Sequence, residues 1–296
     1  CHLRVVPAPP RGGGPVVTGD RGAGVGVEDP RLSGDIHHAP LAVAAAGALA
    51  GALQGELGGI PLAACYGICQ VDFGSVRQRQ PNVVDGTLQH FGRIDYLFNI
   101  AGGGRQAFFL QQPIENIDWV IDINLKCPLV GMRVGGDVLM KQRSGHIINF
   151  ASLAGLSPTP GNSLYSAAKS GLRNASIAAA IEWRTMGISV TVISPDLVDT
   201  PLMQKHLESG KEEVALTYTG VTLTVHDLEQ AFWKAMRDKP LEINLPRWRG
   251  WLTKLNHLNP SIMLWLYEPM KRRGMKRLEK IRKQRSGQGH GTDSLS

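Results

Sequence analysis

The sequence lacks any apolar run of about eighteen residues, and it has few cysteines, with four in 296 residues. The first absence excludes a predicted membrane-spanning helix. The second excludes a disulfide framework, and the pair Cys65 and Cys69 has no second pair or histidine cluster that would complete a zinc site. We therefore expect no metal, and we expect buried thiols in a reducing, cytoplasmic compartment.

Charge is concentrated at one end of the chain. Hydrophobic residues make up 43% and charged residues 19%, which is typical of a globular protein with a large core. The net charge is +7, yet residues 271–285 alone carry +8, from nine Lys or Arg residues against Glu279. We expect no nucleic-acid partner, because this surplus lies in an appendage and the body of the chain is nearly neutral.

From residue 65 onward, short apolar runs alternate with longer helical patterns. This alternation predicts an α/β fold with a doubly wound parallel sheet of the Rossmann type, in which ligands bind at the carboxyl ends of the strands. The predicted strands are Cys65–Phe73, Ile94–Asn99, 147–151 and Ile188–Ile193, and the predicted helices are Val83–Phe91, Ile114–Met140 and 164–186. The predicted limits are 1–12 for an irregular extension, 13–245 for a single dinucleotide-binding catalytic domain, 246–285 for a C-terminal helical appendage and 286–296 for a disordered tail.

Tyr165 and Lys169 are spaced as neighbours on one face of a helix. A free tyrosine has a pKa of about 10, whereas a general acid or base works best near the operating pH. A cation at ~4 Å, in an effective dielectric of about 20, contributes roughly 4 kcal/mol, or close to three pKa units. We therefore expect Lys169 to lower the pKa of Tyr165 and make it a usable proton donor and acceptor.

Ser152 lies just beyond a predicted buried strand, where a hydroxyl can hydrogen-bond a substrate carbonyl. Three flanking motifs accompany it: Phe98-Asn99-Ile100-Ala101-Gly102, Ile123-Asn124-Leu125, and the segment from Ser194 to Pro201 with Asp196 inside it. Together with the Ser152 to Tyr165 interval, these motifs resemble the classical short-chain dehydrogenase/reductase family. Two residues depart from the family pattern. Ile100 lies where the family usually has asparagine, and Asp196 lies where it usually has glycine.

The resemblance implies an oxidoreductase that interconverts a secondary alcohol and a ketone, with NAD or NADP as cofactor. It implies that Tyr165 transfers the hydroxyl proton, Ser152 orients the substrate oxygen and Asn124 holds a water. Lys169 would also bind the nicotinamide ribose. Other implied cofactor contacts are Asp72, Asn99, Ala101, Gly102, Pro195, Val198 and Thr200. It further implies a homodimer or homotetramer. The alternative function is a nucleotide sensor or scaffold of the same fold without turnover.

A glycine-rich stretch precedes these motifs and matches the family less well. Glycines let a backbone approach pyrophosphate closely, but Gly24 and Gly26 fall one residue late after Thr18 and Gly19. A nucleotide-binding turn and a flexible linker fit equally. Residues 13–64 are atypical throughout, and we interpret them as a reading-frame error or a corrupted segment, which resequencing of the gene would test. The residues expected to distinguish NAD from NADP are absent there, so both cofactors stay open.

The appendage begins with an aromatic, apolar stretch at 248–267, broken by Pro260, before the basic residues. Tryptophan-bearing helices followed by basic residues suit anionic membrane surfaces, so peripheral membrane contact through 248–285 is one interpretation. The other, which we favour, is a lid or interface segment packed on the domain. Both place apolar surface near the site and favour a lipophilic substrate.

Overall fold

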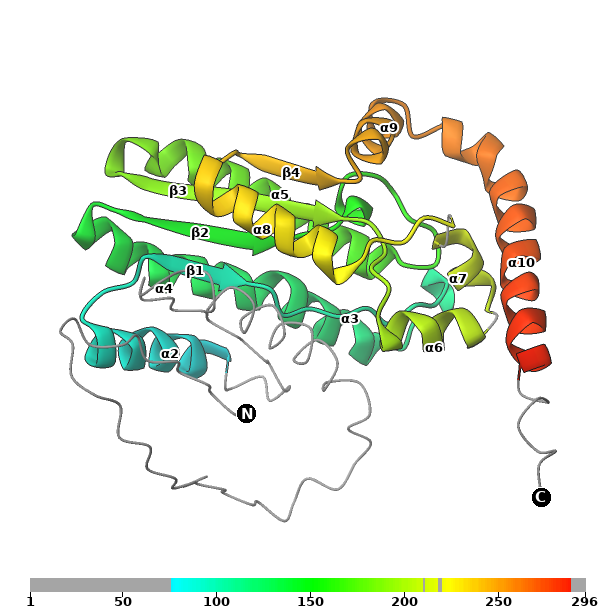
Figure 1. The fold of residues 1–296 in the computed structure, drawn as a ribbon, viewed down its shortest axis with the longest axis horizontal. Coiled ribbons are helices and arrows are strands. Elements are labelled where there is room, and N and C mark those ends of the chain that lie inside the picture. The colour runs from blue at the N-terminus through cyan, green and yellow to red at the C-terminus, as the bar shows by residue number, and fades with distance from the viewer. Residues whose placement is uncertain (1–75, 210, 218–219, 289–296) are drawn as a thin grey trace, which may run out of the picture.

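The computed structural model describes residues 76–209, 211–217 and 220–288. Their centre is a parallel sheet in the order β1-β2-β3-β4, which confirms the predicted α/β class (Figure 1). The first three strands overlap the predicted runs, whereas β4 was not predicted. The predicted strand Cys65–Phe73 and the glycine-rich stretch lie outside the described residues. The strand bounds are Tyr96–Asn99 for β1, Gly145–Phe150 for β2, Ile188–Pro195 for β3 and Glu242–Leu245 for β4.

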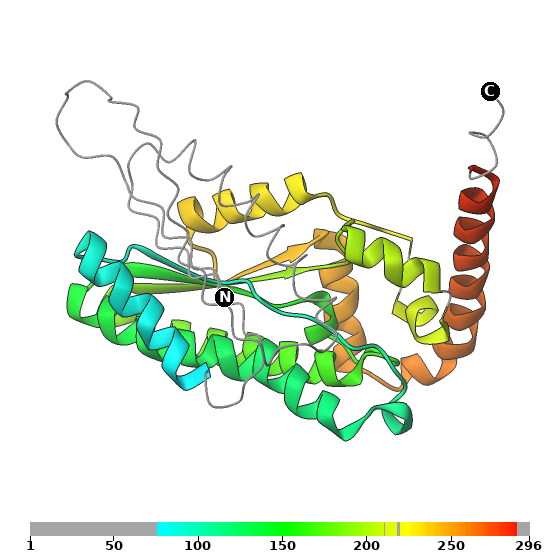
Figure 2. The same ribbon diagram turned by 90° about the horizontal axis from the view of Figure 1, so that it is seen from below.

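Adjacent residues on each strand face opposite sides of the sheet and build two apolar cores. Leu97 and Ile147 pack with residues of α4 (Cys127–Gln142) and α5 (Ser163–Trp183). Their neighbours Phe98 and Ile148 pack with α8 (Val225–Asp238). Figure 2 shows α8 on one side of the sheet and α4 and α5 on the other. Burial on both faces explains why the strands are almost continuously apolar.

The region Ile114–Met140, which was predicted to hold helices, is helical throughout but not uniform in geometry. It comprises α3 (Ile114–Ile121), a π-helical segment at Asp122–Lys126, and α4. The helix α2 (Val76–Phe91) packs against α4. Cys127, at the start of α4, is buried and disulfide-bonded, so the expectation of a free thiol is wrong for this residue.

The appendage forms two helices separated near Pro260, as the sequence predicts. The shorter helix α9 packs against β4, and the long helix α10 packs against α6 and α7. The helix continues beyond Arg285, where the disordered tail was expected to begin, because extending an existing helix avoids the cost of nucleation. None of the described helices combines the length and apolarity needed to cross a bilayer. The bounds are Pro201–Ser209 for α6, Glu212–Thr217 for α7, Arg247–Leu258 for α9 and Ile262–Gln288 for α10.

Gly155 fixes the loop after β2 against α5. A Cβ at Gly155 would lie 2.8 Å from the Lys169 carbonyl carbon, and this backbone atom moves only with the helix. Gly155→Ala should therefore lower the free energy of unfolding by ~1–3 kcal/mol in urea titrations. Gly86→Ala is the control, because a Cβ there meets nothing within 4 Å and should stabilise α2 by ~0.5–1 kcal/mol. Unchanged stability of Gly155→Ala would contradict the tight contact.

Candidate active site

Ser152 lies where two strands end. It follows β2 and caps the 3-10 turn Leu153–Gly155, with its Oγ accepting from the Ala154 N–H at 3.2 Å. The same hydroxyl donates to the carbonyl oxygen of Pro195, the last residue of β3, at 3.4 Å. The long second bond leaves a hydroxyl that is held in place but open to a stronger acceptor.

Lys169 is almost completely buried, with 2% of its surface exposed. Its Nζ donates to the Phe150 carbonyl oxygen at 2.7 Å, which ties α5 to the end of β2. Tyr165 lies one turn earlier on the same helix, and the Lys169 Nζ is 5.6 Å from the centre of its ring. The spacing of the two residues in the sequence therefore correctly predicts that they lie side by side.

Burial shifts the pKa of each member of this pair toward its neutral form. It lowers the pKa of Lys169 to about 7. It raises the pKa of Tyr165 to about 12, and the hydrogen bond with the Ser152 side chain offsets only part of this rise. The expected lowering of the Tyr165 pKa is thus wrong for the protein alone. Removal of each group from water is the largest cause of its shift, because burial disfavours the charged form of both the phenol and the amine.

Asn124 is fully buried in the π-helical segment, and its amide is committed to backbone groups. Its Nδ2 donates to the carbonyl oxygens of Gly103 at 2.7 Å and Val120 at 2.9 Å, while its Oδ1 accepts from the Gly103 N–H at 3.1 Å. Both amide hydrogens are used. Asn124 therefore clamps the loop after β1, and a water expected beside it would have to use the remaining lone pair of Oδ1 or the helix backbone.

A cavity of about 440 Å³ joins these groups at the carboxyl ends of the strands. Ser152, Tyr165 and Lys169 line it, as do the predicted cofactor residues Gly102, Pro195, Val198 and Thr200. Asn99 and Ala101 are not among its lining residues. Asn99 is instead buried in the sheet and donates from Nδ2 to Asn149 Oδ1 at 2.7 Å. Thr18, Gly19, Gly24, Gly26 and Asp72 lie outside the described residues.

The cavity fits the nicotinamide half of a dinucleotide. A Cβ at Gly102 would lie 2.7 Å from Asn124 Oδ1 and 3.0 Å from Lys169 Nζ, so only glycine allows the chain to pass this close to the ammonium. The wall also offers hydroxyl donors at Ser152 and Tyr165. Asn162 adds a buried side-chain oxygen, Oδ1, that accepts no hydrogen bond from the described residues. Such a donor and acceptor set suits ribose hydroxyls and a carboxamide.

Many residues that line the cavity were not predicted, and some of them come from the appendage. Arg249 of α9 forms an ion pair with Asp196 at 2.7 Å, beside the end of β3. Asn256 of the same helix hydrogen-bonds Ser157 in the loop after β2. The sequence marks Asp196 as unusual, because glycine is expected there, but it does not reveal the partner. The appendage thus covers the cavity, in agreement with the lid interpretation. Its other lining residues are Thr253, Met263 and Met270.

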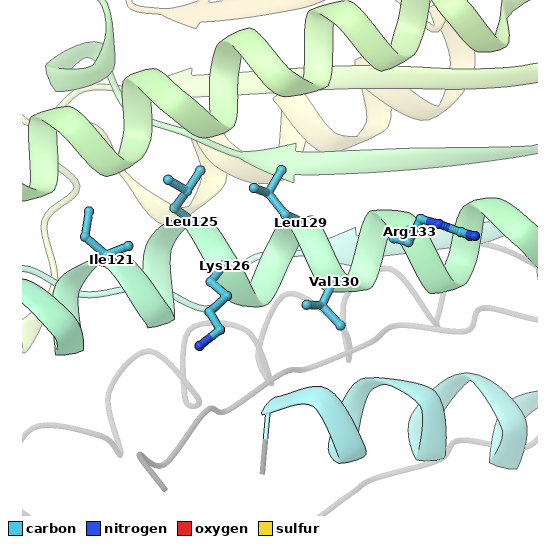
Figure 3. Close-up of a pocket in the computed structure, with 6 residues that line it drawn as sticks. All are labelled: Ile121, Leu125, Lys126, Leu129, Val130 and Arg133. Atoms are coloured by element: carbon cyan, nitrogen blue, oxygen red, sulfur yellow. The ribbon is translucent and has the colours of Figure 1, made fainter. Parts of the chain in front are cut away.

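A second, smaller hollow lies on the surface of α3, the π-helical segment and α4 (Figure 3). None of the predicted site residues lines it. In addition, no group of three His, Cys, Asp or Glu side chains in the described ranges is placed to hold a metal. The cavity beside Tyr165 is therefore the candidate active site. The residues around the second hollow are Ile121, Leu125, Lys126, Leu129, Val130 and Arg133.

Comparison with known families gives one match that covers more than half of the chain. A model of the short chain dehydrogenase family matches residues 41–211. This range contains Asn124, Ser152, Tyr165 and Lys169, but it begins after the glycine-rich stretch. The match therefore gives no support to a nucleotide-binding turn at Thr18 to Gly26.

Curated relatives align over a limited segment. An uncharacterized oxidoreductase of Staphylococcus epidermidis is 35% identical over 130 residues, which cover 44% of this chain and 56% of the relative. A 3-oxoacyl-(acyl-carrier-protein) reductase of Thermotoga maritima is 33% identical over 136 residues, or 46% and 55% of the two chains. The chain thus spans about half the length of the curated relatives it matches.

Solved structures share the fold at low sequence identity. A short chain dehydrogenase/reductase from Burkholderia phymatum in complex with NAD has a TM-score of 0.56 and 20% identity, covering 64% of this chain and 74% of that one. ElxO with NADP bound has a TM-score of 0.52 and 22% identity, covering 60% and 75%. These likenesses support the Rossmann-type sheet.

Burial of Lys169 should make stability rise with pH above neutrality. The Lys169 pKa is about 7 in the folded protein and 10.5 ordinarily, so between these values the folded state binds fewer protons than the unfolded state. The free energy of unfolding should increase through this window, by at most ~1.4 kcal/mol per pH unit, and below pH 7 the full cost of the buried cation is present. Urea unfolding from pH 7 to 9 should show this gain relative to Lys169→Met. The same change in the free energy of unfolding with pH in the parent chain and in Lys169→Met would contradict this effect of Lys169.

Proposed function

The chain belongs to the short-chain dehydrogenase/reductase family of oxidoreductases, and we propose that it interconverts a ketone and a secondary alcohol with NAD or NADP. One observation carries the proposal. Tyr165 and Lys169 share a face of α5 and line the same cavity as Ser152, at the carboxyl ends of β2 and β3. That arrangement places a proton donor, a cation and an orienting hydroxyl around one position.

In the reduction direction, Tyr165 gives its phenolic proton to the carbonyl oxygen as negative charge develops there. Ser152 donates a hydrogen bond to the same oxygen, leaving its long bond to the Pro195 carbonyl. Lys169 holds the ribose through its ammonium and supports the charge on Tyr165 after transfer. The nicotinamide cofactor, when bound, supplies the hydride. Asn124 keeps the loop at Gly103 against this group of residues.

The resting state of Tyr165 at neutral pH is the neutral phenol, because burial raises its pKa to about 12. The phenol has a proton to give in ketone reduction, and in alcohol oxidation the phenolate would accept one. A pKa of about 7 for Lys169 also means that its charge depends on conditions near neutrality, so the rate should respond to its protonation.

The cavity wall supports a lipophilic substrate. Apolar side chains line the cavity together with the polar groups, and the appendage contributes Met263 and Met270 to this wall. A homodimer or homotetramer remains a proposal that the family resemblance motivates, and a cytoplasmic location remains a proposal that the small number of cysteines motivates. The apolar residues that line the cavity from the body of the domain include Leu197, Leu216, Leu228 and Phe232.

A nucleotide sensor without turnover is less well supported. Such a protein needs the sheet and a nucleotide site, but it has no use for a proton donor. The structure instead keeps Ser152 and Tyr165 together at the cavity, with Lys169 beside them. Retention of the complete arrangement favours an enzyme.

Tyr165→Phe should lower turnover of a ketone by at least ~10²-fold, because general acid catalysis contributes ~10² to 10⁴. Affinity for NADH or NADPH, measured by fluorescence titration, should stay within a few fold. Tyr96→Phe is the matched control, since Tyr96 lies on β1 and does not line the cavity. Near-normal turnover in Tyr165→Phe would remove the proposed acid.

Asp196→Ala should loosen the cover over the cavity by removing the carboxylate that Arg249 binds. We expect KM to rise for bulky ketones much more than for small ones, because a bulky ketone would need more contacts with the part of the cavity wall that the appendage supplies. Asp238→Ala disrupts an exposed ion pair with Lys234 and serves as the control. It should change neither the KM for bulky ketones nor the KM for small ones. Equal KM changes for bulky and small ketones would show that the ion pair does not shape substrate binding.

A further inference from the structure

The helix α9 carries its apolar side chains on the face turned away from the protein. Trp248, Trp251, Leu252, Leu255 and Leu258 recur at the spacing of one helical face, and all are more than half exposed. A surface helix normally buries such a stripe. Here the opposite, polar face packs on the domain through the contacts of Arg249, Lys254 and Asn256.

The start of α10, which follows α9 in the chain, carries further exposed apolar side chains. Leu264 is 81% and Trp265 84% exposed. Further along the helix, Arg272 and Lys276 follow Trp265 at the spacing of one face and are also exposed. The inward stripe of α10 includes the buried Gly274, where an added Cβ would strike the Ala215 carbonyl oxygen, and Leu278. Close packing on α7 therefore fixes which side of α10 faces outward.

We propose that this outward surface docks on an anionic lipid bilayer. The docking face consists of the five exposed apolar residues of α9, Leu264 and Trp265, with the basic outer side of α10 beside it. Tryptophan suits the boundary between headgroups and acyl chains, and basic residues suit anionic headgroups. Three of the six tryptophans in the chain lie on this face.

Charge favours a bilayer over a second copy of the chain. A symmetric dimer through this face would place two apolar stripes together, but it would also bring two segments of +8 near each other. Like charges across an interface oppose association. An anionic membrane instead satisfies both parts of the surface, because it offers an apolar interior beneath a negative layer.

The docking face and the candidate active site share the same helices. Thr253 and Asn256 line the cavity from α9, and Met263 and Met270 line it from α10. Docking would therefore set the cavity close to the bilayer surface. If the proposed function holds, a lipophilic ketone could pass from the membrane to Tyr165 without crossing bulk water. The docking itself does not depend on turnover and is tested separately from it.

The test is flotation of the full chain with vesicles. One set contains equimolar phosphatidylcholine and phosphatidylglycerol, and the other contains phosphatidylcholine alone. The chain should bind the anionic vesicles more strongly, and added salt should weaken binding because it screens charge. The double variant Trp251→Glu, Trp265→Glu should bind about tenfold less. Leu110→Glu, at a 98% exposed site on the turn Phe109–Gln111, is the matched control and should bind normally.

Tryptophan fluorescence gives a second readout, since brominated lipids should quench it in the parent chain and much less in the double variant. Absence of binding to both vesicle sets would overturn the proposal, and so would equal binding by the double variant. Self-association that the double variant abolishes, without vesicle binding, would assign the face to a second copy instead. Because activity is not measured, failure here leaves the proposed reaction untouched.

Discussion

The burial of the Lys169 ammonium is the constraint on which the candidate site depends. An ammonium removed from water must donate to protein acceptors, and Lys169 does so to the Phe150 carbonyl oxygen at 2.7 Å. That bond joins α5 to the end of β2. It thereby fixes Tyr165, one turn earlier, opposite Ser152, and the same crowding requires glycine at Gly102. The cost of burial appears in the lowered pKa of Lys169, to about 7.

The orientation of α9 in the appendage is linked to its contacts with polar groups beside the same cavity. Polar groups at the strand ends require polar partners above them, and α9 supplies these through Arg249 and Asn256. Because the polar face of α9 packs against the domain, its apolar face is exposed. The exposed stripe of Trp248 to Leu258 is therefore linked to the way in which the helix covers the site. The lid and membrane interpretations of the sequence are compatible, because they concern opposite faces of one helix.

Much of the fold and the juxtaposition of Tyr165 and Lys169 could be predicted from the sequence, because both depend on local patterns. Buried parallel strands are continuously apolar, and the spacing of Tyr165 and Lys169 places them on one face of any helix. The pKa direction of Tyr165 could not be predicted, since burial is a property of the assembled structure. The same applies to the Asp196 partner, which comes from α9, and to Asn99, whose amide is used inside the sheet. Each depends on contacts between segments far apart in the chain.

The most direct test of the proposed oxidoreductase is to follow the hydride itself. The full chain would be incubated with NADH or NADPH deuterated at the transferable position and with ketones of increasing size, and the products would be examined by NMR. The account predicts deuterium on the carbinol carbon of a secondary alcohol, with bulky lipophilic ketones as the better substrates. Binding of the dinucleotide by fluorescence without deuterium transfer to any ketone would contradict it and would favour the sensor.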